Sequence, residues 1–118
     1  MCRTLQLVRE SSEIVFSPIV AGELMAGFRW DGKFEHHRRE LLEFIAHPRV
    51  HLTPLGVTTS DRYGRIYRLL RKKGTPIPTN DMWVAAQAME TGAELASADR
   101  HFGAVDGLAW IDLSEGGP

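Results

Sequence analysis

The sequence predicts an α/β fold in which helices flank a mostly parallel sheet. Four short apolar runs alternate with stretches whose apolar residues recur at helical spacing, and strands that alternate with helices build parallel sheets. The chain has 118 residues, 43% of them hydrophobic and 25% charged, a composition typical of a globular domain with a real core. No repeat or linker divides it, so we expect residues 1–118 to form one domain with a frayed tail at 114–118.

The first predicted strand leads directly into the first helix. The run Glu-Ile-Val-Phe at 13–16 is β-branched and aromatic, which predicts a buried strand. Ser17 and Pro18 supply an N-cap and a first helical residue, and the apolar stripe that follows ends near Gly27. A second helix is predicted at 34–46, before the next proline.

The middle of the chain holds the second strand and the third helix. Apolar residues at 50–54 predict a short strand. The polar residues at 58–61 are candidate caps for a helix at 60–73. Its predicted buried face consists of Tyr63, Ile66, Tyr67 and Leu70. Two prolines in 74–78 exclude a helix there, so this segment is predicted to be a loop.

One more helix and two strands complete the predicted fold. Thr79 or Asn80 is the expected cap of a helix that Gly92 ends. The apolar stripe of this helix consists of Met82, Ala85, Ala86 and Met89. Residues 94–98 and 108–113 predict the third and fourth strands.

Three carboxylates stand where a purely structural helix or strand would carry an apolar residue. Glu23 lies within the first two turns of its helix, Asp81 lies at the opening of another, and Asp99 follows a strand. Ligands of open parallel sheets gather beyond the carboxyl ends of the strands, so we expect these side chains to face one edge. Buried carboxylates need a compensating cation, and oxygen ligands suit Mg²⁺ or Mn²⁺. The pattern therefore favours metal-assisted cleavage of phosphodiesters.

Each acid taken alone has a simpler structural explanation. Asp81 is typical of a helix cap, Asp99 of a turn, and Glu23 of an exposed helix face. Asn80 and Ser97 flank the acids and are candidates to orient water or phosphate, although a helix cap and a strand-end polar residue are the commoner roles. The metal hypothesis depends on the three acids together.

Basic residues and histidines offer further candidate contacts. Three arginines recur at a spacing of three on one predicted helix, and they are Arg62, Arg65 and Arg68. Contact with an RNA backbone is one interpretation, and a solvated helix face is the commoner one. The run at 36–39, which includes His36 and His37, has the same two interpretations, of which a polar helix start is the commoner. His101 is a candidate for contact with substrate, although an exposed loop histidine is the commoner role.

Bulk properties exclude several classes of protein. No apolar run approaches the roughly 20 residues that span a bilayer, and the first residues lack the pattern of a signal peptide. Cys2 is the only cysteine, which excludes an intrachain disulfide and argues against a cysteine-based zinc site. The net charge is −1, so any affinity for nucleic acid must come from a local patch. We expect a cytoplasmic protein.

Several segments together resemble a known family. SPIVAGELMAG at 17–27, GTPIPTNDMWVAAQA at 74–88, LASADRHF at 95–102 and GLAWIDL at 107–113 look like the PIN-domain ribonucleases, and are closest to the VapC-type toxins of bacterial toxin–antitoxin pairs. The resemblance runs from about residue 5 to residue 113. It implies a three-layer fold with a parallel five-stranded sheet, and Mg²⁺- or Mn²⁺-dependent endonucleolytic cleavage of RNA. Carried over by position, the second, third and fourth acids of the family are Glu23, Asp81 and Asp99.

The first acid of the family, an Asp in a Leu-Asp-Thr-Asn motif on the central strand, has no counterpart in this sequence. We therefore expect the first, central strand to be missing, which would leave two neighbouring strands without a ladder partner. A start that lies upstream, a shortened family member and a strand supplied by another chain are the three explanations. We favour the shortened member, and the loss of one carboxylate should weaken Mg²⁺ binding.

Two classes of function follow from the resemblance. The first is a metal-dependent endoribonuclease of the toxin type, which binds RNA and a cognate antitoxin and forms a homodimer. The second is a non-catalytic PIN-like module that binds an antitoxin or another partner chain. Residues that supply either an interface or core packing are Met25, Phe28, Trp30 and Trp83.

Overall fold

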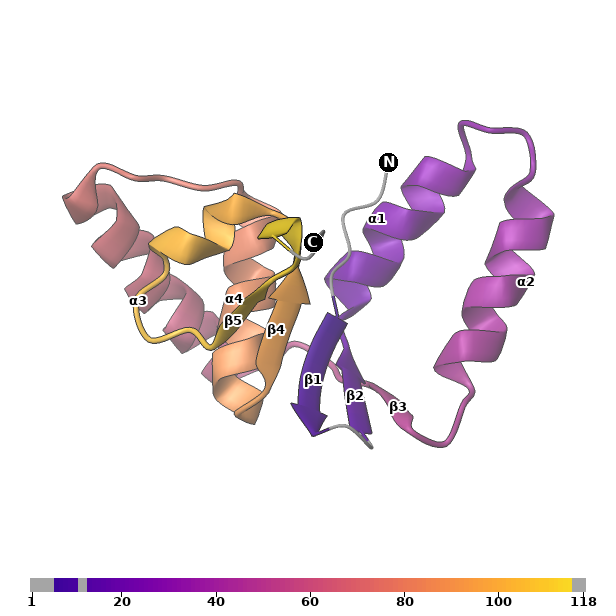
Figure 1. Cartoon of the computed structure of the whole chain (residues 1–118), viewed down its shortest axis with the longest axis horizontal. Helices are drawn as coiled ribbons and strands as arrows, with labels where there is room; N and C mark the ends of the chain where they lie inside the picture. Colours follow the sequence, from indigo (N-terminus) through magenta and orange to yellow (C-terminus); the bar gives the residue numbers. More distant parts are fainter. Residues whose placement is uncertain (1–5, 11–12, 116–118) are drawn as a thin grey trace.

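The computed structural model describes residues 6–10 and 13–115 (Figure 1). In chain order the main elements are β1 (Gln6–Glu10), β2 (Glu13–Phe16), α1 (Pro18–Phe28), α2 (Phe34–Ile45), β3 (Val50–Leu52), α3 (Val57–Lys73), α4 (Thr79–Thr91), β4 (Glu94–Ser97) and β5 (Trp110–Asp112). Two short 3₁₀ helices, η1 (Arg100–Ala104) and η2 (Leu113–Glu115), flank β5.

The strands form one sheet in the order β3-β2-β1-β4-β5. The outer pairs β2–β3 and β4–β5 are parallel, and β1 is antiparallel to both β2 and β4. Four of the five strands therefore point the same way, which confirms the predicted mostly parallel sheet. Figure 1 shows α1 and α2 on one side of the molecule and α3 and α4 on the other, with the sheet between them.

The central strand corrects one expectation. The place between β2 and β4, which the sequence was expected to leave empty, is filled by β1. Its backbone pairs Leu7 with Val15 on one side and with Leu95 on the other. An antiparallel ladder satisfies the N–H and C=O groups of both neighbours as a parallel one would. Residues 6–10 therefore complete the sheet with the opposite strand direction.

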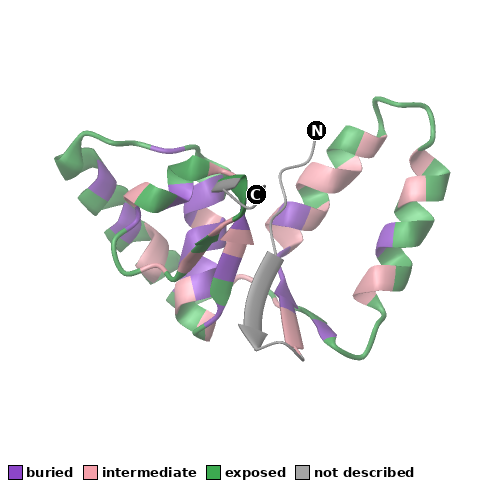
Figure 2. Ribbon diagram, viewed as in Figure 1, coloured by how far each residue is buried: buried purple, intermediate pink, exposed green. Residues whose placement is uncertain are grey.

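The core lies along α4. This helix is buried on most of its circumference, and Val84, Ala85, Ala86 and Ala88 have no exposed surface. Small residues let the helix pack closely against α3, α1 and β4. Figure 2 shows that buried residues concentrate in α4 and β4, whereas α2 is largely exposed. The first turn of α4, which carries Asp81, is thus held by the most densely buried part of the molecule.

The boundaries of several elements differ from the predicted ones. Helix α3 begins at Val57 rather than near residue 60, because Gly56 is the N-cap and its N–H donates to Thr59 Oγ1 at 3.0 Å. Pro78 is the N-cap of α4, so the predicted caps Thr79 and Asn80 lie inside the helix.

The strands predicted at 50–54, 94–98 and 108–113 shorten to 50–52, 94–97 and 110–112. Residues 113–115 form a 3₁₀ turn, and the rest of the predicted frayed tail lies outside the described residues. Within the described ranges, none of the helices combines the length and the apolar character that crossing a membrane requires.

Candidate metal centre

The three predicted acids come from the same edge of the sheet. Strands β2 and β4 point the same way, so the segments that follow them, α1 and η1, leave the sheet at one edge. Glu23 lies in the second turn of α1, and Asp99 is the N-cap of η1. Asp81 lies in the first turn of α4, which runs back along β4 and so begins at that edge.

Asp81, Asp99 and His101 form a compact group. One donor atom from each lies within 4.8 Å of the other two. His101 Nδ1 is 2.8 Å from Asp99 Oδ1 and 3.4 Å from Asp81 Oδ2. The Asp81 side chain is fully buried and that of Asp99 is 7% exposed, whereas the His101 side chain is 49% exposed. The imidazole therefore covers two buried carboxylates on their solvent side.

The turn after β4 explains this arrangement. The Asp99 N–H donates to Ser97 Oγ at 3.0 Å, and the His101 N–H donates to Asp99 Oδ1 at 3.0 Å. These two short-range hydrogen bonds close the chain into η1 and turn the His101 ring back over Asp99. Ser97 is fully buried and its carbonyl accepts from Trp110 Nε1 at 3.1 Å, which fixes the strand end from the β5 side.

Glu23 is linked to the first turn of α4 by a hydrogen bond from the side-chain amide of Asn80. Its Oε2 accepts a hydrogen bond from Asn80 Nδ2 at 3.1 Å, and Asn80 directly precedes Asp81. Among the described residues at this edge, the compact group consists of Asp81, Asp99 and His101, and Glu23 lies outside it. The structure thus brings two of the predicted acids together with a histidine, and ties the third acid to them through Asn80.

The sequence offered substrate contact or an exposed loop position for His101, and its contact with Asp99 and Asp81 was not predicted. The usable indication was its position two residues after Asp99, because an Asx turn brings residue i+2 back to the aspartate. The predicted auxiliary residues differ in role. Asn80 contacts Glu23, whereas Ser97 holds the backbone of Asp99.

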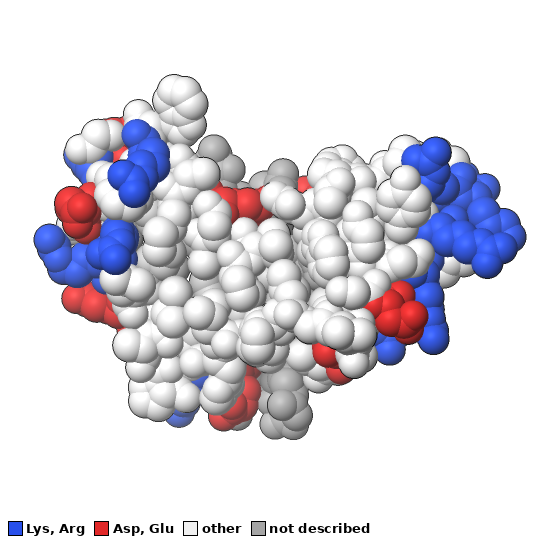
Figure 3. Space-filling view, turned by 180° about the vertical axis from the view of Figure 1, so that it is seen from behind, with Lys and Arg blue, Asp and Glu red and all other residues white. Residues whose placement is uncertain are grey.

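The three arginines lie on α3, away from this group. Arg65 Nη2 is 3.4 Å from Asp61 Oδ2, and both side chains are about 70% exposed, so this pair is a solvated contact one helical turn apart. Arg68 is exposed and Arg62 is half-buried. Figure 3 shows Lys and Arg gathered at the two ends of the molecule, with acidic side chains between them at its upper middle.

The antiparallel direction of β1 determines what this strand brings to the edge. Gln6 pairs with Ala96 near the end of β4, and Val8 pairs with Glu94 at its beginning. The amino end of β1 therefore arrives where the carboxyl ends of β2 and β4 lie. The residue of β1 that pairs with Ala96 near this edge is Gln6.

The donor set fits a divalent cation. Two carboxylates that are buried side by side repel one another and lose hydration, and a cation between them offsets both costs. Carboxylate oxygens suit Mg²⁺ and Mn²⁺, and an added imidazole extends the range to softer ions. Asp81 and Asp99 offer carboxylate oxygens, His101 Nδ1 lies beside both of them, and Glu23 is linked to the start of α4 through Asn80.

Comparison with known proteins gives one family and a set of similar structures. The model of the PIN domain family matches residues 3–108. One similar structure is that of VapBC2 from Rickettsia felis bound to a DNA fragment from its promoter. It is 26% identical with a TM-score of 0.76, over 85% of this chain and 74% of that chain. No curated protein matches the chain.

Two further VapBC structures have the same fold. VapBC-1 from nontypeable Haemophilus influenzae is 26% identical with a TM-score of 0.78, over 92% of this chain and 80% of that chain. VapBC-5 from Mycobacterium tuberculosis, a member of the VapBC family of toxin–antitoxin systems, is 22% identical with a TM-score of 0.66, over 81% of this chain and 77% of that chain. At 22% identity the likeness concerns the fold alone.

Proposed function

The chain belongs to the PIN domain family, and on that premise we propose that it is a divalent-metal-dependent endoribonuclease, the toxin of a toxin–antitoxin pair. The observation that carries the proposal is the convergence of Asp81, Asp99 and His101 at the edge that Glu23 also approaches. Buried acids at a strand end and a helix start are a poor arrangement for stability alone, and a good one for holding a cation beside a phosphate.

Glu23, Asp81 and Asp99 would hold Mg²⁺ or Mn²⁺ in this proposal. When bound, the ion would polarise the scissile phosphate, make a water molecule more acidic and offset charge on the leaving oxygen. The protein supplies the orientation. His101 Nδ1 holds the Asp99 carboxylate, the Asn80 amide holds that of Glu23, and burial fixes Asp81.

RNA would meet the protein from the solvent side of His101, which is the exposed member of the group. Arg62, Arg65 and Arg68 are proposed contacts for the RNA backbone at a distance from the cleaved phosphate, and Arg65 and Arg68 are exposed on α3. Phosphate contacts of this kind are independent of sequence and weaken with salt. Such an enzyme would meet its substrate in the cytoplasm.

The similarity to VapBC structures supports a cognate antitoxin as partner, and we further propose that the chain forms a homodimer. Of the four apolar residues considered for an interface, Trp30 is the best candidate because it is 89% exposed. Trp83 stacks on Tyr63 with ring centroids 4.2 Å apart, so it packs α3 against α4. Met25 and Phe28 pack against the core.

A non-catalytic binding module is the second candidate, and one observation favours it. The strand that occupies the centre of the sheet runs antiparallel, and its described residue nearest the carboxyl ends of β2 and β4 is Gln6, which is not an acid. Glu23, Asp81 and Asp99 alone would then bind a metal more weakly, while the protein could still bind an antitoxin or another partner chain.

RNA cleavage by the purified chain decides between the two. Labelled RNA is incubated with the protein in Mg²⁺ or Mn²⁺, with EDTA, and with the Asp81→Asn variant. The nuclease proposal expects endonucleolytic fragments that EDTA and Asp81→Asn both remove. Fragments that persist with EDTA or in Asp81→Asn would contradict it, and intact RNA together with retained antitoxin binding would support the binding module.

A further inference from the structure

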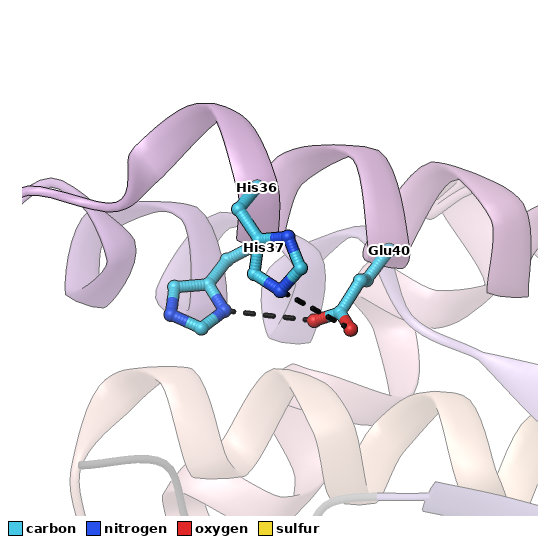
Figure 4. Close-up of side chains that lie close together, drawn as sticks. All are labelled: His36, His37 and Glu40. Atoms are coloured by element: carbon cyan, nitrogen blue, oxygen red, sulfur yellow. Dashed lines mark ion pairs between the residues drawn. The ribbon is translucent and has the colours of Figure 1, made fainter.

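A second group of metal-ligating side chains lies on the α1–α2 hairpin. His36, His37 and Glu40, all on α2, each offer one donor atom within 4.8 Å of the others. Glu40 is four residues after His36 and three after His37, so its carboxylate lies one helical turn further on the face between the two imidazoles. Figure 4 shows both rings directed at that carboxylate.

The spacing of the donors differs from that of ordinary hydrogen bonds. His36 Nε2 is 3.5 Å from Glu40 Oε2, and His37 Nδ1 is 3.6 Å from Glu40 Oε1. Protein N–H···O hydrogen bonds are shorter, at about 2.7–3.2 Å. Two ligands of one tetrahedral zinc ion, with bonds of about 2.0–2.1 Å, lie about 3.3–3.4 Å apart. The two separations are close to that value and involve different oxygens of Glu40, and one donor atom from each of the three residues lies within 4.8 Å of the other two.

The His37 ring is also held from its far side. Its Nε2 lies 3.1 Å from Asp31 Oδ2, while Asp31 Oδ1 accepts from the Lys33 N–H at 2.9 Å. The Phe28 ring packs on the imidazole with centroids 5.1 Å apart. A carboxylate on one imidazole nitrogen directs the lone pair of the other nitrogen at a metal, which is the usual support of metal-binding histidines.

His51 and Glu13 form an exposed histidine–carboxylate pair with no third donor among the described residues, and this pair serves for comparison. His51 Nε2 contacts Glu13 Oε1 at short range, and both side chains are about half exposed. Within the described ranges no group of three donors includes this pair. The His36–His37–Glu40 group differs by a third donor, by longer separations and by the support of Asp31.

We propose that His36, His37 and Glu40 bind a divalent ion of the zinc class, with Asp31 as the positioning residue of His37. Two imidazoles and one carboxylate favour Zn²⁺ over Mg²⁺. Three protein ligands leave a fourth position for water, because the His36 and Glu40 side chains are about 60% exposed. The ion would tie α2, through His37 and Asp31, to the turn that joins it to α1.

Zinc chloride titrated into the full chain, followed by nitrogen NMR of the histidine side chains, tests this site without reference to nuclease activity. The expected result is metal-induced shifts of His36 Nε2 and His37 Nδ1 at one equivalent of Zn²⁺, with no competition from Mg²⁺. Shifts confined to His51 or His101, or no shift of these two nitrogens, would overturn the proposal.

Three variants make the test quantitative. His37→Ala should weaken Zn²⁺ binding by at least about 100-fold, and Asp31→Asn by about 10-fold, the range seen when the partner of a metal-bound imidazole is lost. His51→Ala is the matched control and should leave the affinity unchanged. Because His51 and Asp31 are exposed, these changes leave the fold intact. Equal affinities of His37→Ala and His51→Ala would refute the site.

Discussion

The acidic group at the sheet edge and the His36–His37–Glu40 group on α2 differ in burial and in donor chemistry. In the first, two nearly inaccessible aspartates lie behind one half-exposed imidazole. In the second, two imidazoles and a glutamate stand on a largely exposed helix. Burial makes uncompensated charge expensive, so the first group needs a cation more than the second. Donor type then favours hard ions in the first group and zinc-class ions in the second.

Both groups contain side chains that bind metals, but this does not by itself give either group a catalytic role. A catalytic site needs buried residues that hold the ligands in place and a solvent-exposed face that substrate can approach. Asp81 and His101 supply these two sides, whereas His36 and Glu40 are both open to solvent. The proposed catalysis therefore belongs to the sheet edge, and the ion proposed for the hairpin has no catalytic role.

The largest expected effect is that of Asp81→Asn on RNA cleavage. Loss of a buried anionic ligand should lower the cleavage rate at fixed Mg²⁺ by at least about 100-fold. A gel assay with labelled RNA measures the rate. Asp61→Asn, which changes an exposed carboxylate in the first turns of α3, is the matched control and should be neutral. Equal rates for the two variants would remove the distinction between buried and exposed acids.

His101→Ala should give an intermediate loss. The ring contacts Asp99 at 2.8 Å, and its removal should raise the Mn²⁺ or Mg²⁺ concentration needed for half-maximal cleavage by about 10-fold. The rate at saturating metal should fall less, because His101 acts through the orientation of Asp99. The metal dependence of cleavage separates the two effects, and a loss that saturating metal does not restore would place His101 in direct contact with substrate.

A variant of one group, assayed for the property of the other group, tests whether the two groups are independent. Sites that share no contacts behave additively to within about 0.5 kcal/mol, or about twofold in affinity. Asp81→Asn should therefore leave Zn²⁺ binding at the hairpin within that factor, and His37→Ala should leave RNA cleavage within it. Calorimetry with Zn²⁺ and the cleavage assay check both. A larger change in either would mean that the two groups are coupled through α1.

A modest change in stability is expected for α1, which carries Glu23 and forms half of the hairpin. Ser17 is fully buried and its Oγ accepts from the Ile19 amide. Ser17→Ala should lower the free energy of unfolding by about 1 kcal/mol, which corresponds to a fall in Tm of about 4 °C. Thermal unfolding followed by circular dichroism measures it. An unchanged Tm would show that another group caps α1.

The sequence predicted those parts of the fold that depend on local patterns. The strand at 13–16 and the Ser17-Pro18 helix start are both observed, because cap chemistry and apolar runs act over a few residues. Strand β1 was not predicted, because two apolar residues within five are a weak strand pattern. Its direction follows from its closeness to β2 in the sequence, since β1 ends at Glu10 and β2 begins at Glu13, and a parallel pair would need a much longer connection. The placement of β1 at the centre of the sheet depends on pairing with both β2 and β4, and β4 lies far along the chain from the other two strands.

The candidate site was predicted in part for the same reason. Strand ends and helix starts placed Glu23, Asp81 and Asp99 at one edge, and the structure has all three there. The close contact of His101 depends on a 3₁₀ turn that the sequence did not predict. The link between Glu23 and Asn80 joins residues of α1 and α4, and only the packing of these helices brings them together.

The most direct test of the central claim is a Mn²⁺ titration of the full chain followed by backbone NMR. A paramagnetic ion broadens the signals of the residues around it. If the acids share a divalent ion, the amide signals of Glu23, Asp81 and Asp99 should broaden first, and Mg²⁺ should reverse the effect. Broadening confined to His36 and His37, or spread evenly over exposed carboxylates, would contradict the account.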